Sequence, residues 1–303
     1  MRSTLKKSCI ILLSIVVGCL AIVGGVNYWV DPYNEFGRNH IGLYFSSSRQ
    51  AKTQITKYPH DALLLGSSMV EYIDPADICC YQFYNASFYS AYPEEIFFYL
   101  QKYAHQERLV VIGFNFFMFN EHKDPLRQWT QWPDHFNPPM EYVFGYQVWQ
   151  DSLTALNNFH KGLQPSYYPD GHRVFQGLFH GEKFNQDLHD QIVAGIKSRD
   201  FYNFLFSEQR MDYVVRIKQL LQTRGIKTVY FINPLQEEVH RLINDLGLSV
   251  RYHQWRERMK QLLPDVVDLS ESFLQEQYYT PNDIYHYRPE VGAFFINQML
   301  KSL

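Results

Sequence analysis

Cysteine is scarce in this sequence, and its few copies do not suit a disulfide framework. Of the four, Cys9 and Cys19 lie in an apolar run, while Cys79 and Cys80 are neighbours, where a disulfide is strained. No Cys-x-x-Cys pair and no cluster of cysteine and histidine has the spacing of a structural metal site. The sequence therefore predicts a domain that folds on its own hydrophobic core, without a metal or a cofactor.

An excess of charge of one sign is also lacking. The formal net charge is −3 and no basic block stands out, so nucleic acid is not an expected partner. No glycine-rich phosphate loop follows the first predicted strand, which argues against a nucleotide-binding protein. Aromatic residues, by contrast, make up 17% of the chain. They either fill the core or line a groove for sugar rings or acyl chains.

A long uncharged run extends from Cys9 to Val30. Its length matches the roughly 20 residues that cross a bilayer as a helix. Basic residues precede the run and Asp31 and Glu35 follow it, which places the N-terminus in the cytoplasm and the rest of the chain outside. We expect residues 1–30 to form a cytoplasmic N-terminus and a single transmembrane signal anchor, with a periplasmic or extracellular domain after it.

Two kinds of processing would remove this anchor, and the sequence favours neither. A cleaved signal peptide has a shorter apolar core and an Ala-x-Ala-like end, which the stretch VNYWVDPYNEF does not offer. The string VVGC, ending at Cys19, resembles a lipoprotein cleavage box, but the residues after Cys19 stay apolar. We therefore expect an uncleaved anchor, followed by a polar and irregular tether over residues 31–58.

Short apolar strands alternate with helical patterns in the rest of the chain. The predicted strands are 61–65, 81–87, 108–115, 226–234 and 265–270, and the predicted helices are 94–105, 207–225, about 235–263 and 288–303. Such an alternation forms a parallel sheet that helices cover on both faces. We therefore predict an α/β domain over residues 59–303, with a flavodoxin-like three-layer α/β/α arrangement around a central parallel sheet.

Residues 117–206 interrupt this alternation. The segment is rich in Trp, Tyr, Phe, Pro and His, its periodicity is weak, and it is too long for a plain loop in a compact domain. We interpret it as an inserted cap over the carboxyl edge of the sheet. An irregular surface excursion with its own local packing is the alternative.

Small and polar residues stand at the ends of the predicted strands, where parallel sheets place their sites. They are Gly66, Ser67 and Ser68 after the first strand, Asn85 to Ser90 after the second, and Gly113 and Asn115 at the third, with Asp283 and His286 just before the last helix. A serine becomes a nucleophile when a histidine takes its proton, and a carboxylate holds that histidine in the correct tautomer. Ser68, His286 and Asp283 could fill these roles. The backbone N–H of Ser68, a backbone N–H after the second strand and the side chain of Asn115 could stabilise an oxyanion.

The order Gly-x-Ser, Asn-Ala-Ser, Gly-x-Asn and Asp-x-x-His resembles the SGNH (GDSL-like) hydrolase superfamily, over residues 60–116 and 226–303. The resemblance implies that Ser68 is the nucleophile, His286 the base and Asp283 its orienting acid. It implies that Ser68, Ser90 and Asn115 supply the oxyanion hole, with Gly66, Ser67, Asn85 and Gly113 as structural neighbours. Two positions depart from the family pattern: Ser90 replaces a glycine, and Ser67 replaces an Asp.

Both departures, and the stretch VDPYNEFG after the anchor, are similar to the membrane-anchored branch that modifies envelope polymers, such as alginate O-acetylation and teichoic acid D-alanyl transfer proteins. This resemblance implies an exported serine esterase or O-acyltransferase that acts on acyl esters of envelope glycans. A glycan acceptor and a multi-spanning membrane protein that delivers acyl groups are the implied partners. The alternative is an inactive carbohydrate-binding or assembly subunit with the same fold.

Each of these residues also has a purely structural interpretation. Ser67 and Ser68 would let a strand pack closely on a helix, Asn115 would be a satisfied buried amide, and Asp283 and His286 would be a cap and a surface residue. Asn85-Ala86-Ser87 fits an N-glycosylation acceptor, although a strand end is a poor place for a glycan.

Overall fold

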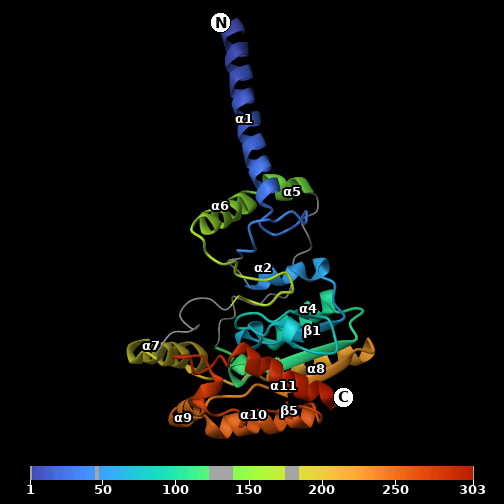
Figure 1. The fold of residues 1–303 in the computed structure, drawn as a ribbon, viewed down its shortest axis with the longest axis vertical. Helices are drawn as coiled ribbons and strands as arrows, with labels where there is room; N and C mark the ends of the chain where they lie inside the picture. The colour runs from blue at the N-terminus through green and yellow to red at the C-terminus, as the bar shows by residue number, and fades with distance from the viewer. Residues whose placement is uncertain (1, 45–47, 123–138, 175–183, 303) are drawn as a thin grey trace. The chain divides into compact units, whose positions relative to one another are not determined.

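The computed structural model describes residues 2–44, 48–122, 139–174 and 184–302 (Figure 1). The chain divides into two compact units. Unit 1 comprises Met1–Gln54 and Pro133–Tyr168, and unit 2 comprises Ile55–Trp132 and Pro169–Leu303.

Unit 1 begins with helix α1 (Arg2–Val30), whose stretch Lys6–Val30 is long and apolar enough to cross a membrane. The apolar side chains along most of α1 are exposed, as in a helix that needs another apolar environment. The unit also contains α2 (Ser48–Lys52), α5 (Pro139–Phe144) and α6 (Tyr146–His160). Asn27, near the end of α1, donates to the carbonyl of Val143 at 2.9 Å, which joins α1 to α5.

The segment after α1 is more ordered than the expected tether. Asp31 is fully buried, and its carboxylate accepts hydrogen bonds from the backbone N–H groups of Glu35, Phe36 and Arg38 and from the hydroxyl of Tyr142. Further along, α2 is followed by a 3₁₀-helix, η1 (Thr53–Lys57). Residues 31–44 contain turns and bends but no helix or strand, whereas buried polar contacts and short helices order parts of the segment 31–58. That the segment acts as a tether stays a prediction.

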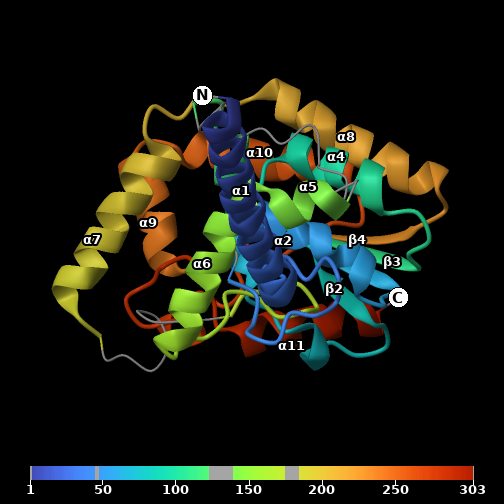
Figure 2. The same ribbon diagram turned by 90° about the horizontal axis from the view of Figure 1, so that it is seen from above.

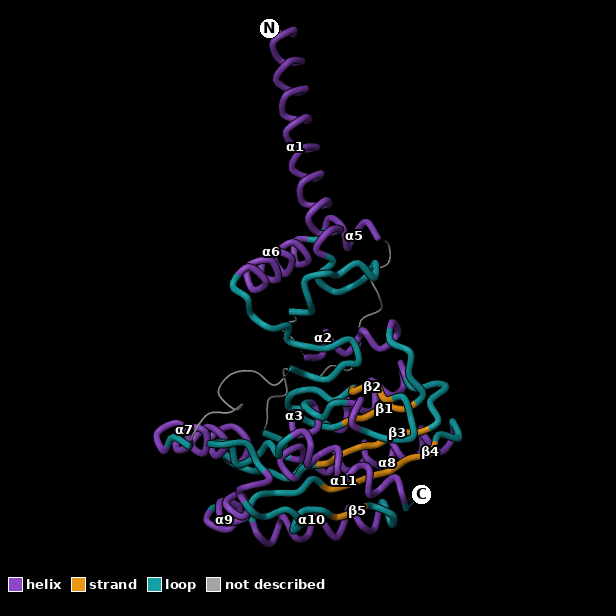
Figure 3. Tube along the Cα trace, in the orientation of Figure 1, coloured by secondary structure: helices purple, strands orange, loops and turns teal. Residues whose placement is uncertain are grey.

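Unit 2 is built around a parallel sheet, and the described residues contribute five strands in the order β2-β1-β3-β4-β5 (Figure 3). The strands are β1 (Ala62–Leu65), β2 (Phe83–Asn85), β3 (Leu109–Phe114), β4 (Lys227–Ile232) and β5 (Val267–Asp268). β1, β2 and β3 are buried throughout, as expected for a sheet with both faces covered. The order is that of flavodoxin-like doubly wound sheets, whose switch point lies between β1 and β3.

Helices cover both faces of the sheet. α4 (Pro93–Tyr103) and α8 (Glu208–Thr223) lie together on one face, and α11 (Pro289–Lys301) lies on the other (Figure 2). α11 packs closely enough that a Cβ on Gly292 would come within 2.6 Å of Ile73. The α/β class and the parallel central sheet predicted from the sequence are confirmed.

Several boundaries differ from those predicted. The expected helix at 235–263 is two helices, α9 (Glu237–Asp245) and α10 (Ser249–Leu262), separated at Gly247, whose φ of +70° ends α9. β2 and β5 are shorter than expected, because only their centres pair with neighbouring strands. Ser207 precedes α8 at the N-cap position, but its side chain makes no capping hydrogen bond.

The segment 117–206 is divided between the two units. α5 and α6 belong to unit 1, whereas α7 (Gln186–Ile196) and the π-helix η5 (Lys197–Phe201) belong to unit 2. Much of the described part of this segment is helical. Residues 123–138 and 175–183 lie outside the described part of the chain. A cap over the sheet edge stays a prediction.

Candidate active site

Ser68 is the first residue of the short helix α3 (Ser68–Glu71), which begins three residues after β1. Ser67 is the N-cap of this helix, and its hydroxyl accepts a hydrogen bond from the N–H of Met69 at 3.4 Å. This cap ends the strand abruptly and leaves Ser68 at the carboxyl edge of the sheet, 8% exposed. Two small hydroxyl residues at the strand end thus have different roles: one caps the turn and the other faces the histidine.

His286 meets Ser68 across 218 residues of sequence, and Asp283 binds the other side of its ring. His286 Nε2 lies 2.9 Å from Ser68 Oγ, and His286 Nδ1 lies 2.6 Å from Asp283 Oδ2. The other carboxylate oxygen of Asp283 accepts the N–H groups of Tyr285 and His286, at 2.7 and 3.1 Å. The carboxylate is thus fixed by its own turn, and the imidazole is oriented from Nδ1 toward the serine.

The carboxylate of Asp283 stays ionised in this setting. Burial by itself would raise its pKa, but the charge of His286, with the hydrogen bonds from His286 and Tyr285, lowers the pKa below its usual value. An ionised carboxylate next to Nδ1 favours the tautomer in which Nε2 is free to accept a proton. The arrangement can supply a nucleophile, a base and a group that orients the base.

Tyr72 forms a wall of this site that the sequence did not indicate. Its ring meets the imidazole of His286 edge to face, with centroids 5.5 Å apart. Burial raises the pKa of Tyr72 to about 12, so its hydroxyl stays neutral. Arg173 covers Tyr72, with the guanidinium carbon 5.6 Å from the ring centroid and Nη1 3.6 Å from the buried carboxylate of Glu71. Only proximity in the fold identifies these residues, because no motif in the sequence includes them.

Asn115 reaches the same strand end from β3. Its side chain is 2% exposed, and Nδ2 donates to Ser67 Oγ at 2.5 Å. Oδ1 of Asn115 has no hydrogen-bond partner among the described residues. If the amide turned by 180°, Oδ1 would accept from the Ser67 hydroxyl and Nδ2 would become the group without a partner. The structure therefore brings Asn115 to the turn from β1 to α3, residues 66–68, which we call the nucleophile turn. There the amide of Asn115 is bonded to Ser67.

Ser90 occupies a backbone conformation that favours glycine. Its φ is +49°, in the left-handed region, and the residue is 7% exposed. A serine held in this region costs free energy that its surroundings must offset. The turn after β2 thus holds a residue with a side chain in a backbone conformation that favours glycine.

Gly66, Asn85 and Gly113 position the nucleophile turn. A Cβ on Gly66 would lie 2.6 Å from Val70 Cγ2, and one on Gly113 would lie 2.5 Å from the ring of Phe231, so both glycines permit close packing. The Asn85 amide donates to the carbonyls of Val70 and Ile73, at 3.0 and 2.9 Å, and its oxygen accepts from Ser87 N. Asn85 thus binds the end of α3 to β2 with its side chain buried, a setting that does not suit a glycan.

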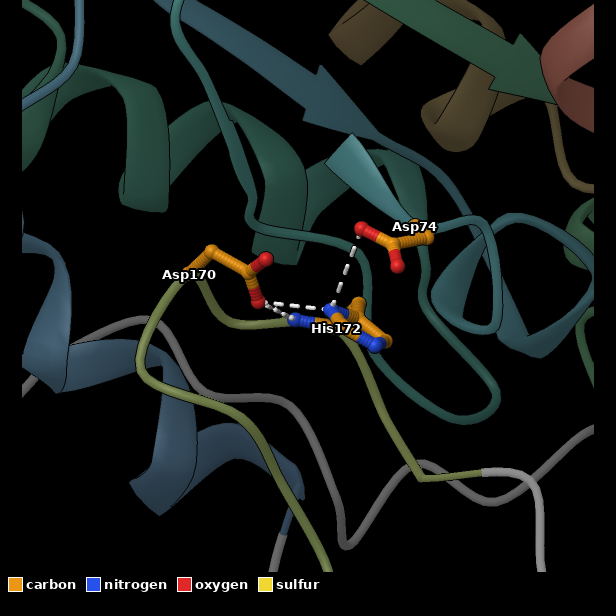
Figure 4. Close-up of side chains that lie close together, drawn as sticks. All are labelled: Asp74, Asp170 and His172. Carbon is orange, nitrogen blue, oxygen red and sulfur yellow. Dashed lines mark hydrogen bonds and ion pairs between the residues drawn. The ribbon is translucent and has the colours of Figure 1, made fainter. Parts of the chain in front are cut away.

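A second polar cluster in unit 2 consists of Asp74, Asp170 and His172 (Figure 4). Their ligand atoms lie within 4.8 Å of one another, a spacing that a metal ion could bridge. However, His172 Nδ1 already bonds Asp170 Oδ1 at 2.6 Å, and Asp74 Oδ1 lies 3.9 Å from His172 Nδ1. Because a metal would have to replace that hydrogen bond, the cluster is explained as a link between two loops. The short string Asp-Gly-His was its only signal in the sequence.

No protein-family model matches the chain, and no curated protein matches it. The functional proposal therefore rests on these residues and their arrangement.

Proposed function

We propose that this protein is a membrane-anchored serine esterase or O-acyltransferase that acts on acyl esters of cell-envelope glycans. The observation that carries the proposal is the chain of hydrogen bonds from Ser68 Oγ through the imidazole of His286 to Asp283, at 2.9 and 2.6 Å. The order of motifs resembling SGNH hydrolases supports it. The long apolar α1 supports a membrane anchor, and the basic residues that precede its apolar run support a location of the domain outside.

In this mechanism Ser68 Oγ attacks the ester carbonyl while His286 Nε2 takes its proton. The tetrahedral oxyanion receives hydrogen bonds from the N–H groups of Ser68 and Ser90 and from Asn115, whose amide must then point to the substrate rather than to Ser67. The protonated His286 gives its proton to the leaving alcohol, and an acyl-Ser68 remains. Asp283 stays ionised and stabilises the imidazolium.

The second half of the reaction decides between hydrolysis and transfer. Water attacking the acyl-serine gives an esterase, whereas a sugar hydroxyl gives an O-acyltransferase, and exclusion of water favours the second. In each case His286 accepts the proton of the attacking oxygen and returns it to Ser68. If the acyl group came from the cytoplasm, a multi-spanning membrane protein would have to deliver it to the domain outside.

Hydrolysis of an aryl acetate by the full chain in detergent tests the proposal. We expect Ser68→Ala and His286→Ala each to lower the rate about a thousandfold or more. Ser198→Ala, which removes an exposed hydroxyl in the same unit, is the matched control and should leave the rate unchanged. Equal rates in all four proteins, with folding intact, would remove the catalytic assignment.

An inactive carbohydrate-binding or assembly subunit is the second candidate. It is favoured by the contact of Asn115 with Ser67, which takes the amide away from an oxyanion position. Labelling with a fluorophosphonate separates the two candidates, because the reagent modifies only an activated serine. Mass analysis that finds Ser68 modified supports the enzyme, and an unmodified Ser68 in folded protein supports the binding subunit.

A further inference from the structure

A cavity of about 400 Å³ lies in unit 2 between the N-terminal ends of α7 and α9 and the segment 274–284. Figures 1 and 2 both show α7 beside α9. The loop that carries Asp283 forms part of its wall, and Asn282 of that loop accepts the N–H of Asn185 at 2.6 Å. Cavities of about this size hold small organic molecules. The described residues of the cavity do not include Ser68, so it is distinct from the nucleophile turn.

Hydrogen-bond acceptors and negative charge dominate this cavity. Three glutamates line it, Glu237, Glu238 and Glu276, against one arginine, Arg241. Glu238 is paired with His189, at 3.1 Å. Glu237 and Glu276 form no ion pair among the described residues and are exposed, so their charges are available to a ligand.

Two buried side chains of the cavity wall lack hydrogen-bond partners. Gln236 is 6% exposed and Thr280 is 4% exposed. Within the described part of the chain, Gln236 Oε1 and Thr280 Oγ1 have no partner. Buried polar atoms are rarely left unpaired, and such exceptions mark strain or an interaction with a water molecule, an ion or a ligand. A ligand that donates hydrogen bonds would satisfy both.

The placement of the carboxylates argues for an organic ligand rather than a metal ion. Among the described residues, the one group of three or more His, Cys, Asp and Glu side chains whose ligand atoms all lie within 4.8 Å of one another is Asp74, Asp170 and His172. The carboxylates of the cavity are thus too dispersed to coordinate a single ion. The ring of Phe184, 52% exposed, adds an apolar face to the wall.

We propose that this cavity binds a hydroxylated primary amine of the amino-sugar class. The exposed carboxylates of Glu237 and Glu276 attract the ammonium group, hydroxyl groups bond Gln236 and Thr280, and the ring of Phe184 packs on the carbon face of the sugar. This proposal concerns binding alone and does not depend on the proposed ester chemistry.

Titration of the full chain in detergent with D-glucosamine, followed by ligand-observed NMR and calorimetry, tests it. D-Glucose is the neutral analogue with nearly the same shape. We expect glucosamine to bind at least about tenfold more tightly than glucose, and added salt to weaken its binding. Equal binding of the two sugars, or no binding of glucosamine, would overturn the proposal.

Single-residue variants test which side chains of the cavity bind glucosamine. Glu237→Gln and Glu276→Gln should each weaken glucosamine binding several-fold, and Gln236→Ala should do the same by a separate contact. Glu290→Gln is the matched control, because Glu290 and Glu237 both lie in the first turn of a helix and both are exposed. If Glu237→Gln, Glu276→Gln and Gln236→Ala all bind glucosamine with the same affinity as Glu290→Gln, and have the same thermal stability, the cavity does not bind the amino sugar.

Discussion

His286 is held by different neighbours at three positions of its ring. Nδ1 bonds Asp283, Nε2 faces Ser68, and Tyr72 packs against the ring. Each contact removes a rotational freedom, so that in the proposed mechanism the imidazole is preorganised for proton transfer before a substrate binds. Tyr72 acts on this site through His286 rather than by itself, which makes it a positioning residue.

The lowered pKa of Asp283 makes the stability of the domain depend on pH. Because the folded pKa lies below the unfolded value of about 3.9, the carboxylate stabilises the fold above that pH and loses this effect as the pH falls further. Asp283→Asn should be less stable than the native chain by about 1–3 kcal/mol near pH 7. The difference should shrink as the pH approaches 3.

Urea unfolding of both proteins in detergent, followed by tryptophan fluorescence between pH 7 and 3, measures this difference. Asp245→Asn, at an exposed position near the end of α9, is the control and should show little difference at any pH. A difference for Asp283→Asn that stays constant down to pH 3 would contradict the assignment.

Ser90 allows a second test at this scale. Ser90→Gly keeps the backbone N–H and suits φ of +49°, so we expect ester hydrolysis to continue and stability to stay the same or rise by up to about 1 kcal/mol. Ser90→Val places a branched side chain in the left-handed region and should cost about 1–3 kcal/mol, with loss of hydrolysis. Thermal unfolding and aryl acetate hydrolysis measure both effects. A valine variant as stable and active as the glycine variant would show that this turn does not shape the site.

At the scale of elements, the turn from β1 to α3 is the part of the fold that makes the site. The strand is buried, the helix begins within three residues, and Asn85 binds the end of that helix to the neighbouring strand. Space in the turn is limited, because the carbonyl of Gly113 lies 3.1 Å from where a Cβ on Gly66 would be. The position of Ser68 therefore depends on small residues around it.

Gly66→Ala should destabilise the protein by about 1–3 kcal/mol, because the new Cβ would lie 2.6 Å from Val70 Cγ2. Adding Val70→Ala removes that methyl group and should restore activity in part, although it leaves a small cavity. Gly195→Ala is the control: nothing lies within 4 Å of its Cβ in α7, and alanine favours a helix. Unfolding curves and hydrolysis rates compare the variants, and a Gly66→Ala protein as stable as Gly195→Ala would contradict this account of the turn.

At the scale of the whole molecule, the chain joins two compact units, one of which contains the apolar helix α1. The proposed function requires unit 2 to lie outside the membrane. Cys79 and Cys80 are exposed in unit 2, and their sulfur atoms are 2.7 Å apart, so they provide natural labels for its location.

After mild reduction, a membrane-impermeant maleimide should label the chain in intact bacterial spheroplasts. The double variant Cys79→Ser, Cys80→Ser keeps Cys9 and Cys19 in α1 and should not be labelled. Labelling that appears only after lysis would place unit 2 in the cytoplasm and exclude an envelope substrate.

Local patterns in the sequence were enough for many features. The apolar run of α1, the alternation of strands and helices and the parallel sheet follow from periodicity and from short buried runs, which depend on near neighbours. Boundaries were less exact: the helix predicted over 235–263 is interrupted at Gly247, because one residue with φ of +70° ended α9 within a continuous helical pattern.

The sequence by itself determined which residue types stand at the strand ends and that the chain has an α/β alternation after an apolar helix. Only the tertiary structure decided that Ser68 and His286, 218 residues apart, lie within hydrogen-bond distance, that Asn115 bonds Ser67, and that residues 139–168 pack with the N-terminal segment. The reason is physical: local conformation depends on a few adjacent residues, whereas such meetings depend on how whole elements bury their apolar faces.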